Sequence, residues 1–457
     1  MKTPSRRFIT VDYENTLTET LTLDEYIPLG HLARFLVDSI AQLDMEPFYA
    51  HYSNRGGKLY MPEMLLALLI YGYINQTFSS RKIEKATYES LPFIFLAGGL
   101  HPDHNTLSTF RKTFLPHFKK VSVQVLVLAQ KKGLLSMGDI SLDGTKVHAD
   151  ASKGQAVSYK HLLKSKKYLE QEIDELLALA EFAQQEEDDE WPEGFVLEDE
   201  LSLRLERLEN LQKAEVVLEA RAKQRYEAEF ASYEAKMKRR LEKERKTGKK
   251  PRGRAPQPPA SGPRDKDQYN FTDPDSRIMK NGANKGFDQH YNAQIAVEHE
   301  SRLIVASTLS NHPNDKKEAK PTLEAIPEEI GKPRSVSMDN GYFSEKNIEY
   351  CENRGIEPYI ATGREPHHKS WLDFFQQETS PKAEASPIVK MAYKLRTEAG
   401  KAIYRLRKCT VEPVIGILKE IMGFRQFSLR GLDAASGEWS LVCLAYNIKR
   451  MHKLTTP

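Results

Sequence analysis

The chain has 457 residues, of which 40% are hydrophobic and 29% are charged, and its formal net charge at pH 7 is +3. This length corresponds to about three domains of ordinary size. No apolar run reaches the roughly 18 residues of a membrane-spanning helix, and the basic N-terminus lacks the apolar stretch of a signal peptide. The three cysteines are too few and too scattered for a disulfide framework or a zinc site. We therefore expect a cytoplasmic protein that does not enter a membrane.

Residues 1–133 are predicted to form a helical N-terminal domain. Pro62 opens a leucine-rich helix, and Ser79 or Ser80 caps a second helix. Asp103 or Asn105 caps a third helix, which Pro116 is expected to break or kink.

Basic residues on these helices indicate a possible contact with DNA. Arg81, Lys82 and Arg111 are expected at exposed positions of short helices joined by tight turns, which is compatible with a helix-turn-helix DNA reader. An ordinary small helical domain accounts for the same residues, and the sequence leaves both interpretations open.

Two segments nearly 200 residues apart are alike. Residues 140–144 and 336–340 each alternate apolar and small polar residues, as a half-buried strand does. Each contains an aspartate followed by a turn-forming residue, so we expect Asp143 and Asp339 at the tips of two strands. Carboxylates placed in this way are the oxygen ligands that Mg²⁺ prefers.

Residues 156–263 are predicted to be an insertion. Residues 156–245 are almost wholly helical in composition and are interrupted at residues 191–194, so two antiparallel helices of coiled-coil type fit this segment. Eleven Lys or Arg residues lie between Lys236 and Arg254. Residues 251–263 are rich in Pro, Gly, Ser and Ala and are expected to form an extended, mobile linker.

Residues 134–155 and 264–457 are predicted to form an α/β domain. A strand hairpin over residues 289–298 and 302–307 is followed by the Asp339 strand, a helix over 344–353 and a strand over 358–362. A core helix through Trp439 closes the domain. The expected fold is thus a mixed sheet with helices, preceded by a helical domain and interrupted by a helical hairpin.

A third carboxylate, Glu412, lies in a segment of helical pattern. On a regular helix Arg405, Lys408 and Lys419 would share its face, and a carboxylate flanked by cations suits a metal ion and a phosphate. Pro413 disfavours helical geometry at Glu412, so a helix is expected to begin or kink there. Without the two aspartates, the better interpretation of Glu412 is a surface residue in an ion pair. The order Asp, Asp, Glu indicates a two-metal phosphoryl-transfer enzyme acting on nucleic acid.

Several stretches carry a more specific similarity: residues 78–84, 141–146, 338–343, and 411–414 with 423–425. Through them the chain resembles the DDE transposases of bacterial insertion sequences, and the similarity extends over essentially its whole length. The resemblance implies a ribonuclease H-like catalytic domain. It also implies that Asp143, Asp339 and Glu412 are the catalytic, metal-binding triad.

Many DDE transposases also carry Tyr, Arg, Glu and Lys separated by two, three and six residues. Tyr404 and Arg407 keep the first spacing here, and Glu412 and Lys419 keep the last. Four residues separate Arg407 from Glu412, and Lys408 stands where the arginine is expected. The resemblance implies DNA contacts by Tyr404, Lys419 and, at the position of the signature arginine, Arg407. The helical-face argument independently favours Arg405 and Lys408 as DNA contacts.

The resemblance implies a reaction and its partners. Two Mg²⁺ ions, for which Mn²⁺ substitutes, would support in-line attack by water or a 3′-hydroxyl and hence strand cleavage and strand transfer. The expected partners are double-stranded DNA, as terminal inverted repeats and target DNA, and a second copy in a homodimer on the DNA. The expected setting is the bacterial nucleoid.

Two other classes of protein share parts of these patterns. Residues 142–145 resemble the opening motif of haloacid-dehalogenase-type phosphatases, but Ser141 stands at the position of the nucleophilic aspartate. A catalytically inactive DNA-binding or assembly protein on the same fold is the main alternative. The histidines at 101, 104, 367 and 368 lack further ligands at metal-binding spacing and are expected in loops.

Overall fold

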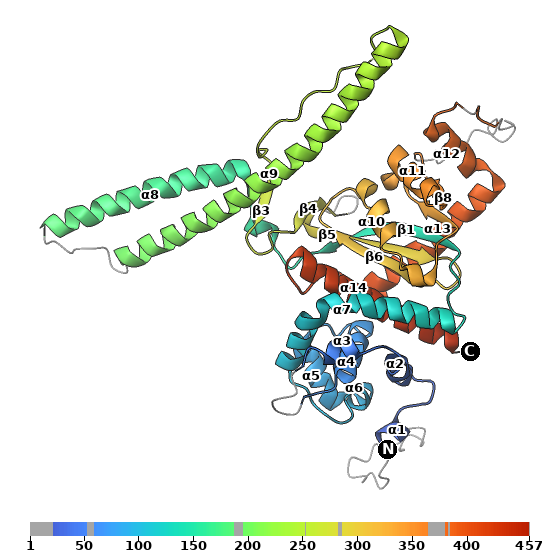
Figure 1. Ribbon diagram of the computed structural model, residues 1–457. Coiled ribbons are helices and arrows are strands. Elements are labelled where there is room, and N and C mark those ends of the chain that lie inside the picture. Colours follow the sequence, from blue (N-terminus) through green and yellow to red (C-terminus); the bar gives the residue numbers. More distant parts are fainter. Residues whose placement is uncertain are drawn as a thin grey trace, which may run out of the picture.

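The computed structural model describes residues 22–52, 59–186, 195–251, 253–281, 286–363, 380–382 and 384–456. The expected helix break at residues 191–194 and the histidine pair at 367 and 368 lie outside this range. Figure 1 shows an α/β body with a layer of N-terminal helices on one side and a long helical arm. In the part of the chain that is described, no helix has both the length and the apolar character to cross a membrane.

A six-stranded sheet forms the centre of the body. Its strands are β1 (Asp139–His148), β4 (Arg277–Lys280), β5 (Phe287–Glu298), β6 (Ile304–Ser310), β7 (Ser335–Met338) and β8 (Glu357–Ile360). β5 pairs antiparallel with β1 on one side and with β4 and β6 on the other. From β1 the sheet continues through β7 and β8 as parallel strands. Antiparallel strands followed by parallel ones form a ribonuclease H-like mixed sheet, so the expected fold class is confirmed.

Helices cover both sides of this sheet. α10 (Ala319–Glu324) and α11 (Glu345–Asn353) lie on one side, and α14 (Leu432–Thr455), with α7 (His104–Lys131) behind it, lies on the other (Figure 1). α12 (Pro387–Arg396) packs against β8, and α13 (Glu398–Gly416) packs against β1, β5 and β7. α14 is the predicted core helix, and it buries Trp439 and most of its other residues.

The N-terminal helices share the core of the sheet domain. They are α1 (Leu23–Tyr26), α2 (Leu32–Ile40), α3 (Glu46–Tyr49), α4 (Pro62–Ile74), α5 (Ser80–Glu89) and α6 (Leu91–Leu96). α4 is apolar on all sides and almost fully buried, as expected for a helix enclosed by others. One hydrophobic core runs from these helices through α14 into the sheet, so residues 22–133 do not form a separate globule.

The structure bears on two expectations about α7. The helix does not break at Pro116, because Asp103 caps its start and aromatic residues on both sides of the proline, Phe114 and Phe118, are buried in the same core; the alternative, a kink there, stays a prediction. Arg111 is buried rather than exposed, and its Nη1 donates to the carbonyl of Phe78 at 3.1 Å. Arg111 therefore holds helices together and is not available to DNA.

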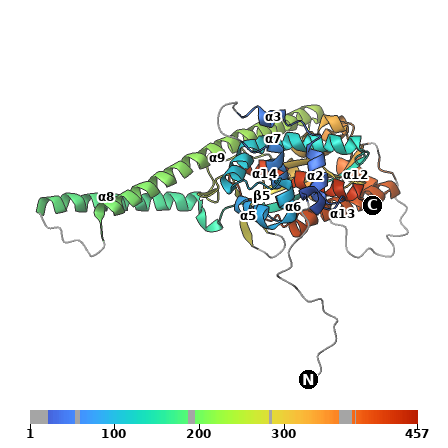
Figure 2. The same ribbon diagram turned by 90° about the horizontal axis from the view of Figure 1, so that it is seen from below.

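The insertion forms an arm of two antiparallel helices, α8 (Tyr159–Glu186) and α9 (Leu197–Thr247). A small apolar seam of Leu162, Leu169, Leu211 and Leu218 joins them. At the base, β2 (Ala156–Ser158) pairs antiparallel with β3 (Gln268–Asn270). α8 and the first part of α9 project together from the body (Figure 2). Beyond its pairing with α8, α9 runs on past the base of the arm, away from the tip that it shares with α8 (Figure 1).

Between α9 and β3, the described residues (248–251 and 253–267) contain no helix or strand, as expected for an extended segment, but they do not form a free linker. Arg240 Nη2 donates to the carbonyls of Pro251 and Gly253, at 2.8 and 3.0 Å. Arg225 Nη2 donates to the carbonyl of Gly262 at 3.1 Å. Aromatic side chains of α9 stack along the helix, including Tyr226 on Phe230, and α9 thus provides a surface along which the Pro-rich segment returns to the body.

The paired ends of the arm allow a test of its independence. We predict that joining Ser158 to Gln268 through a two-residue Asn-Gly turn, which suits a hairpin, removes the arm and leaves a folded body. The shortened protein should melt cooperatively in calorimetry and keep the near-ultraviolet circular dichroism of its buried aromatic residues. A chain without a cooperative transition would show that the arm is part of the core.

Candidate active site

The two aspartates lie where neighbouring parallel strands separate. β1 and β7 are paired up to Leu142 and Met338, so Asp143 and Asp339 are the next residues on their strands. Asp339 directly follows β7, as expected. Asp143 lies in the middle of β1, contrary to the expectation of a strand tip, because β5 remains paired with β1 as far as His148.

The backbone that follows each aspartate fixes one carboxylate oxygen. The amide of Gly144 donates to Oδ1 of Asp143 at 2.9 Å, and the amide of Gly341 donates to Oδ1 of Asp339 at 2.8 Å. These short-range bonds limit the rotation of both side chains. The glycines are thus part of the local structure that presents the two carboxylates.

Arg407 joins the first aspartate to the glutamate. Its Nη1 lies 3.0 Å from Asp143 Oδ2, and its Nη2 lies 2.9 Å from Glu412 Oε1. The guanidinium also lies 5.8 Å from the ring centroid of Tyr404. Arg407 therefore contacts Asp143, Glu412 and Tyr404 in spite of the additional residue between Arg407 and Glu412.

Burial and like charge shape the electrostatics of this cluster. The side chains of Asp143 and Arg407 are 18% and 12% exposed, and that of Glu412 is 45% exposed. Burial raises the pKa of Asp143 to about 6, Asp339 and Glu412 add to this rise, and Arg407 opposes it. Ionised carboxylates so arranged favour a cation among them.

The course of α13 bears on two expectations. The helix does not begin at Pro413 but runs through it to Gly416, so only the kink at Pro413 stays a prediction. Thr410, Val411 and Val414 face the core, whereas Arg405 and Lys408 are exposed. Arg407 is the arginine that pairs with the carboxylates, and the helical-face argument did not select it. The DNA contacts expected of Arg405 and Lys408 stay predictions.

The remaining predicted DNA contacts are Lys419 and two cations of α5. After α13 the chain forms a wider π-helical turn (Ile417–Ile421), and Lys419 Nζ donates to the carbonyl of Lys146 at 2.8 Å. This turn moves Lys419 off the regular helical register expected from the sequence. Arg81 and Lys82 are exposed on α5, which lies on the other side of α14 from α13 (Figure 1).

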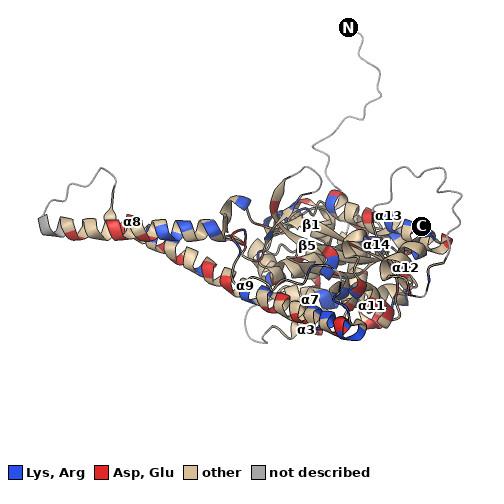
Figure 3. Cartoon of the chain, turned by 90° about the horizontal axis from the view of Figure 1, so that it is seen from above, with Lys and Arg blue, Asp and Glu red and all other residues tan. Residues whose placement is uncertain are grey.

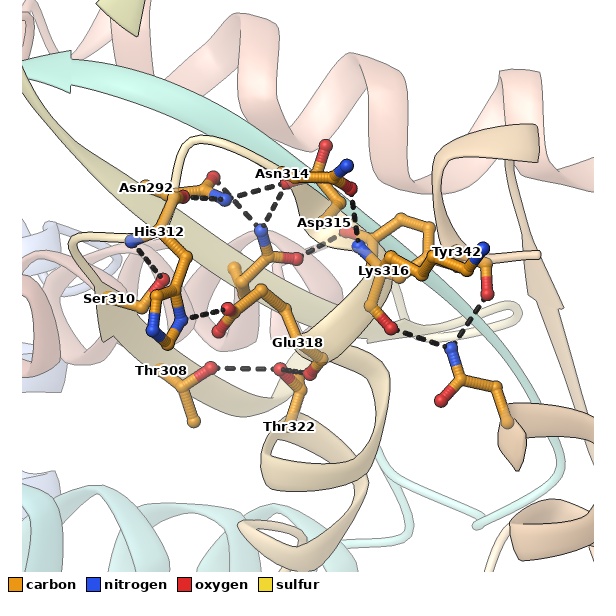
Figure 4. Close-up of polar contacts among 12 residues, drawn as sticks. Asn292, Thr308, Ser310, His312, Asn314, Asp315, Lys316, Glu318, Thr322 and Tyr342 are labelled. Carbon is orange, nitrogen blue, oxygen red and sulfur yellow. Dashed lines mark hydrogen bonds and ion pairs between the residues drawn. The ribbon is translucent and has the colours of Figure 1, made fainter. Parts of the chain in front are cut away.

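A fourth carboxylate, Asp315, is not predicted by any sequence pattern. Its Oδ1 accepts from Asn292 Nδ2 at 2.7 Å and Gln294 Nε2 at 2.9 Å (Figure 4), and Lys146 Nζ lies 3.4 Å away. A Cβ atom at Gly144 would lie 3.0 Å from this oxygen and 2.3 Å from Gln294 Nε2. The glycine after Asp143 is the available signal, because a side chain there would have to displace the amide of Gln294.

The same network reaches the turn after Asp339. The hydroxyl of Tyr342 donates to Oε1 of Gln294. Asn347 Nδ2 donates to the carbonyls of Tyr342 and Lys316, at 2.7 and 3.0 Å. Asp315 and its neighbours thus hold the Asp339 turn against β5.

The donor set of the cluster fits a divalent metal ion, since three carboxylates offer the oxygen ligands of a hard cation. Among the described residues, no three Asp, Glu, His or Cys side chains lie close enough together to coordinate one ion in this conformation. Arg407 lies between two of the carboxylates instead. Asp143, Asp339 and Glu412 are the carboxylates here that could hold a metal ion.

Two protein-family models match the chain. Residues 254–448 match the transposase DDE domain, and residues 21–113 match the transposase domain DUF772. The chain belongs to the DDE transposases. Its activity is therefore transposition by DNA cleavage and strand transfer, and it binds DNA. Searches of curated proteins and of solved structures gave no match.

The two matched ranges include only part of the candidate site. Asp339 and Glu412 lie within the DDE match, whereas Asp143 and both arm helices lie in the interval between the matches. DDE transposases generally use a divalent metal. The observations that connect Asp143 to this site are its register beside Asp339 and its contact with Arg407.

The ion pairs of Arg407 lead to a prediction about stability. Arg407→Gln should lower the free energy of unfolding in EDTA by about 1–3 kcal/mol, because hydrogen bonds to charged groups are removed and the carboxylates remain. Saturating Mn²⁺ should narrow this difference, since a divalent cation also neutralises the carboxylates. Denaturant unfolding with and without Mn²⁺ measures both effects.

Arg405→Gln is the matched control, because Arg405 is an exposed arginine on the same helix. It should change stability by less than about 0.5 kcal/mol in either condition. Equal effects of the two substitutions would contradict a special role of Arg407 in balancing the carboxylates.

Proposed function

We propose that Asp143, Asp339 and Glu412 are the catalytic triad of this transposase and hold two Mg²⁺ ions, for which Mn²⁺ substitutes. The observation that carries the proposal is the bridge from Asp143 through Arg407 to Glu412, beside the register-matched Asp339. Bound metal would supply activation of the attacking oxygen and stabilisation of the leaving oxygen. The substrate is double-stranded DNA, first at the terminal inverted repeats and then at the target.

The residues around the triad have distinct tasks in this proposal. Arg407 has a forked guanidinium that binds phosphate as well as carboxylate, so it neutralises the triad without DNA and contacts the backbone when DNA is present. Tyr404 supports the guanidinium through its ring. Arg405 and Lys408 are exposed on the same helix and contact the DNA backbone. Lys419 holds the end of this helix against β1 and also contacts the DNA.

The N-terminal region and a second copy complete the proposal. Arg81 and Lys82 are exposed on α5 and serve as DNA contacts of the N-terminal helices. Two ends of an element must be brought together for transfer, so we infer a homodimer on the DNA, at the bacterial nucleoid. Arg111 is not retained, because it is buried.

The triad is tested by substitutions that keep the shape of each side chain. Asp143→Asn, Asp339→Asn and Glu412→Gln should each reduce cleavage of a duplex carrying an element end by at least about a thousandfold, because each removes a charged metal ligand. Affinity for the duplex should remain within about threefold. Cleavage assays and binding in EDTA measure the two properties.

An active parent and inactive variants would separate this proposal from its alternative, an assembly protein without catalysis. Near-normal cleavage by one variant would remove that residue from the triad. A parent chain that binds element ends but never cleaves them would favour the alternative.

The basic end of α9 is proposed as a contact for the DNA backbone. Both signs of charge are spread along the arm (Figure 3), but eight Lys or Arg residues between 236 and 250 are exposed: Lys236, Lys238, Arg239, Lys243, Arg245, Lys246, Lys249 and Lys250. Arg240 is excluded because it binds the returning segment. Such cations engage phosphates rather than bases.

Replacing Lys236, Lys238 and Arg239 with Gln should weaken binding to specific and random duplexes alike. The slope of log affinity against log salt should become shallower by about 0.9 for each phosphate that the variant no longer neutralises. The control replaces Lys160, Lys164 and Lys167, exposed lysines of α8, and should leave the slope unchanged. Equal slopes in all three proteins would show that the basic end does not contact DNA.

A further inference from the structure

Each carboxylate of the triad follows a hydroxyl residue by two positions. Ser141 precedes Asp143, Ser337 precedes Asp339 and Thr410 precedes Glu412, and all three hydroxyl residues are buried. Ser141 Oγ lies 2.7 Å from Ser337 Oγ and 3.0 Å from Thr410 Oγ1. The three elements that carry the triad, β1, β7 and α13, therefore meet through these hydroxyls.

Ser141 is the centre of this contact. Its third partner is His299 Nε2 at 2.8 Å. A hydroxyl has one hydrogen to donate and two lone pairs to accept, so three partners fill its capacity. A buried hydroxyl whose capacity is filled has little freedom to exchange partners.

The contact between the two serines fixes the relative positions of the aspartates. Ser141 and Ser337 are directly paired residues of the parallel β1–β7 ladder. Residues two apart on a strand point to the same face, roughly 6.6 Å apart along it. A slip of β7 by one residue would separate the serines and turn Asp339 to the opposite face of the sheet.

The contact with Thr410 fixes the position of α13. Arg407 precedes Thr410 by three residues and shares its side of the helix. With Thr410 against Ser141, Arg407 reaches Asp143, which lies two residues further along β1. Thr410 Oγ1 also lies 2.8 Å from the carbonyl of Leu406, which restrains its rotamer.

We propose that Ser141, Ser337 and Thr410 are positioning residues: they set how Asp143, Asp339 and the helix carrying Glu412 are aligned relative to one another along the strands. The inference rests on the proposed triad and extends it to the groups that hold its geometry. The hydroxyls act through the carboxylates, so their removal changes metal binding and the cleavage step rather than affinity for DNA.

The chain contains a close structural match that serves as a control. Thr322 is buried on α10, and its Oγ1 lies 2.8 Å from Thr308 Oγ1 on β6 (Figure 4). It also lies 2.8 Å from the carbonyl of Glu318, four residues earlier. Thr322 thus repeats the contacts of Thr410, a strand hydroxyl and a helix carbonyl, on elements that carry no triad residue.

The experiment compares full-length Thr410→Val, Thr410→Ser, Ser337→Ala and Thr322→Val. It measures Mn²⁺ binding without DNA, the Mg²⁺ concentration for half-maximal cleavage, affinity for duplex DNA in EDTA, and Tm. Thr410→Val and Ser337→Ala should weaken Mn²⁺ binding about tenfold and raise the Mg²⁺ requirement similarly, as for other groups that orient metal ligands. DNA affinity should not change, and Thr410→Ser should restore metal binding.

Thr322→Val should lower Tm as Thr410→Val does and leave Mn²⁺ binding unchanged. If Thr322→Val weakens metal binding equally, or if Thr410→Val and Ser337→Ala lower only Tm, the inference is overturned while the triad stands. Ser337→Ala is the smaller change and keeps the test decisive if Thr410→Val does not fold. If Asp339→Asn and Glu412→Gln themselves bind Mn²⁺ like the parent, the proposed triad fails instead.

Discussion

Mutual repulsion of carboxylates in a half-buried space is the constraint on which the site depends. Asp143 and Asp339 come from adjacent strands, and Glu412 comes from a helix packed on them. Burial raises the pKa of Asp143, and the other two carboxylates raise it further. The fork of Arg407 offsets this repulsion by pairing with Asp143 and Glu412 together. A half-buried group of carboxylates that is offset by one arginine is suited to divalent cations and to the phosphates that accompany them.

The rest of the body serves to bring these groups together from distant parts of the chain. Parallel pairing of β1 with β7 places two residues nearly 200 positions apart side by side. The insertion between them does not disturb this pairing, because β2 and β3 return the chain to its starting point. α14 and the N-terminal helices enclose the opposite side in a continuous core. The separation between a rigid carboxylate site and long projecting arm helices suits an enzyme that acts on an extended DNA substrate.

Local patterns in the sequence were sufficient for most of the elements. Alternation of apolar and small residues predicted the strands at Asp143 and Asp339, and the composition of residues 156–245 predicted the helical arm. Rules about single residues were less successful. Pro116 and Pro413 do not end their helices, because burial of apolar neighbours on both sides outweighs one missing backbone hydrogen bond. Arg111 is basic yet buried, which depends on tertiary packing and not on its neighbours in sequence.

In the candidate site too, some features follow from local sequence patterns and others depend on tertiary contacts. The order of Asp143, Asp339 and Glu412 led to the proposed triad, whereas a regular helical register around Glu412 did not reveal the ion pairs of Arg407. Asp315 and the hydroxyls of Ser141, Ser337 and Thr410 gain their importance only from contacts between elements, which no local pattern contains. Their nearest sequence signals are the glycine after Asp143 and the hydroxyl residue two positions before each carboxylate.

The most direct test of the account is anomalous X-ray scattering from crystals of the protein soaked with Mn²⁺. The account predicts an anomalous peak within ligand distance of Asp143 and at least one of Asp339 and Glu412, with Arg407 withdrawn from the shared oxygens. A well-ordered site with no peak at these carboxylates, or Mn²⁺ bound only elsewhere, would contradict it.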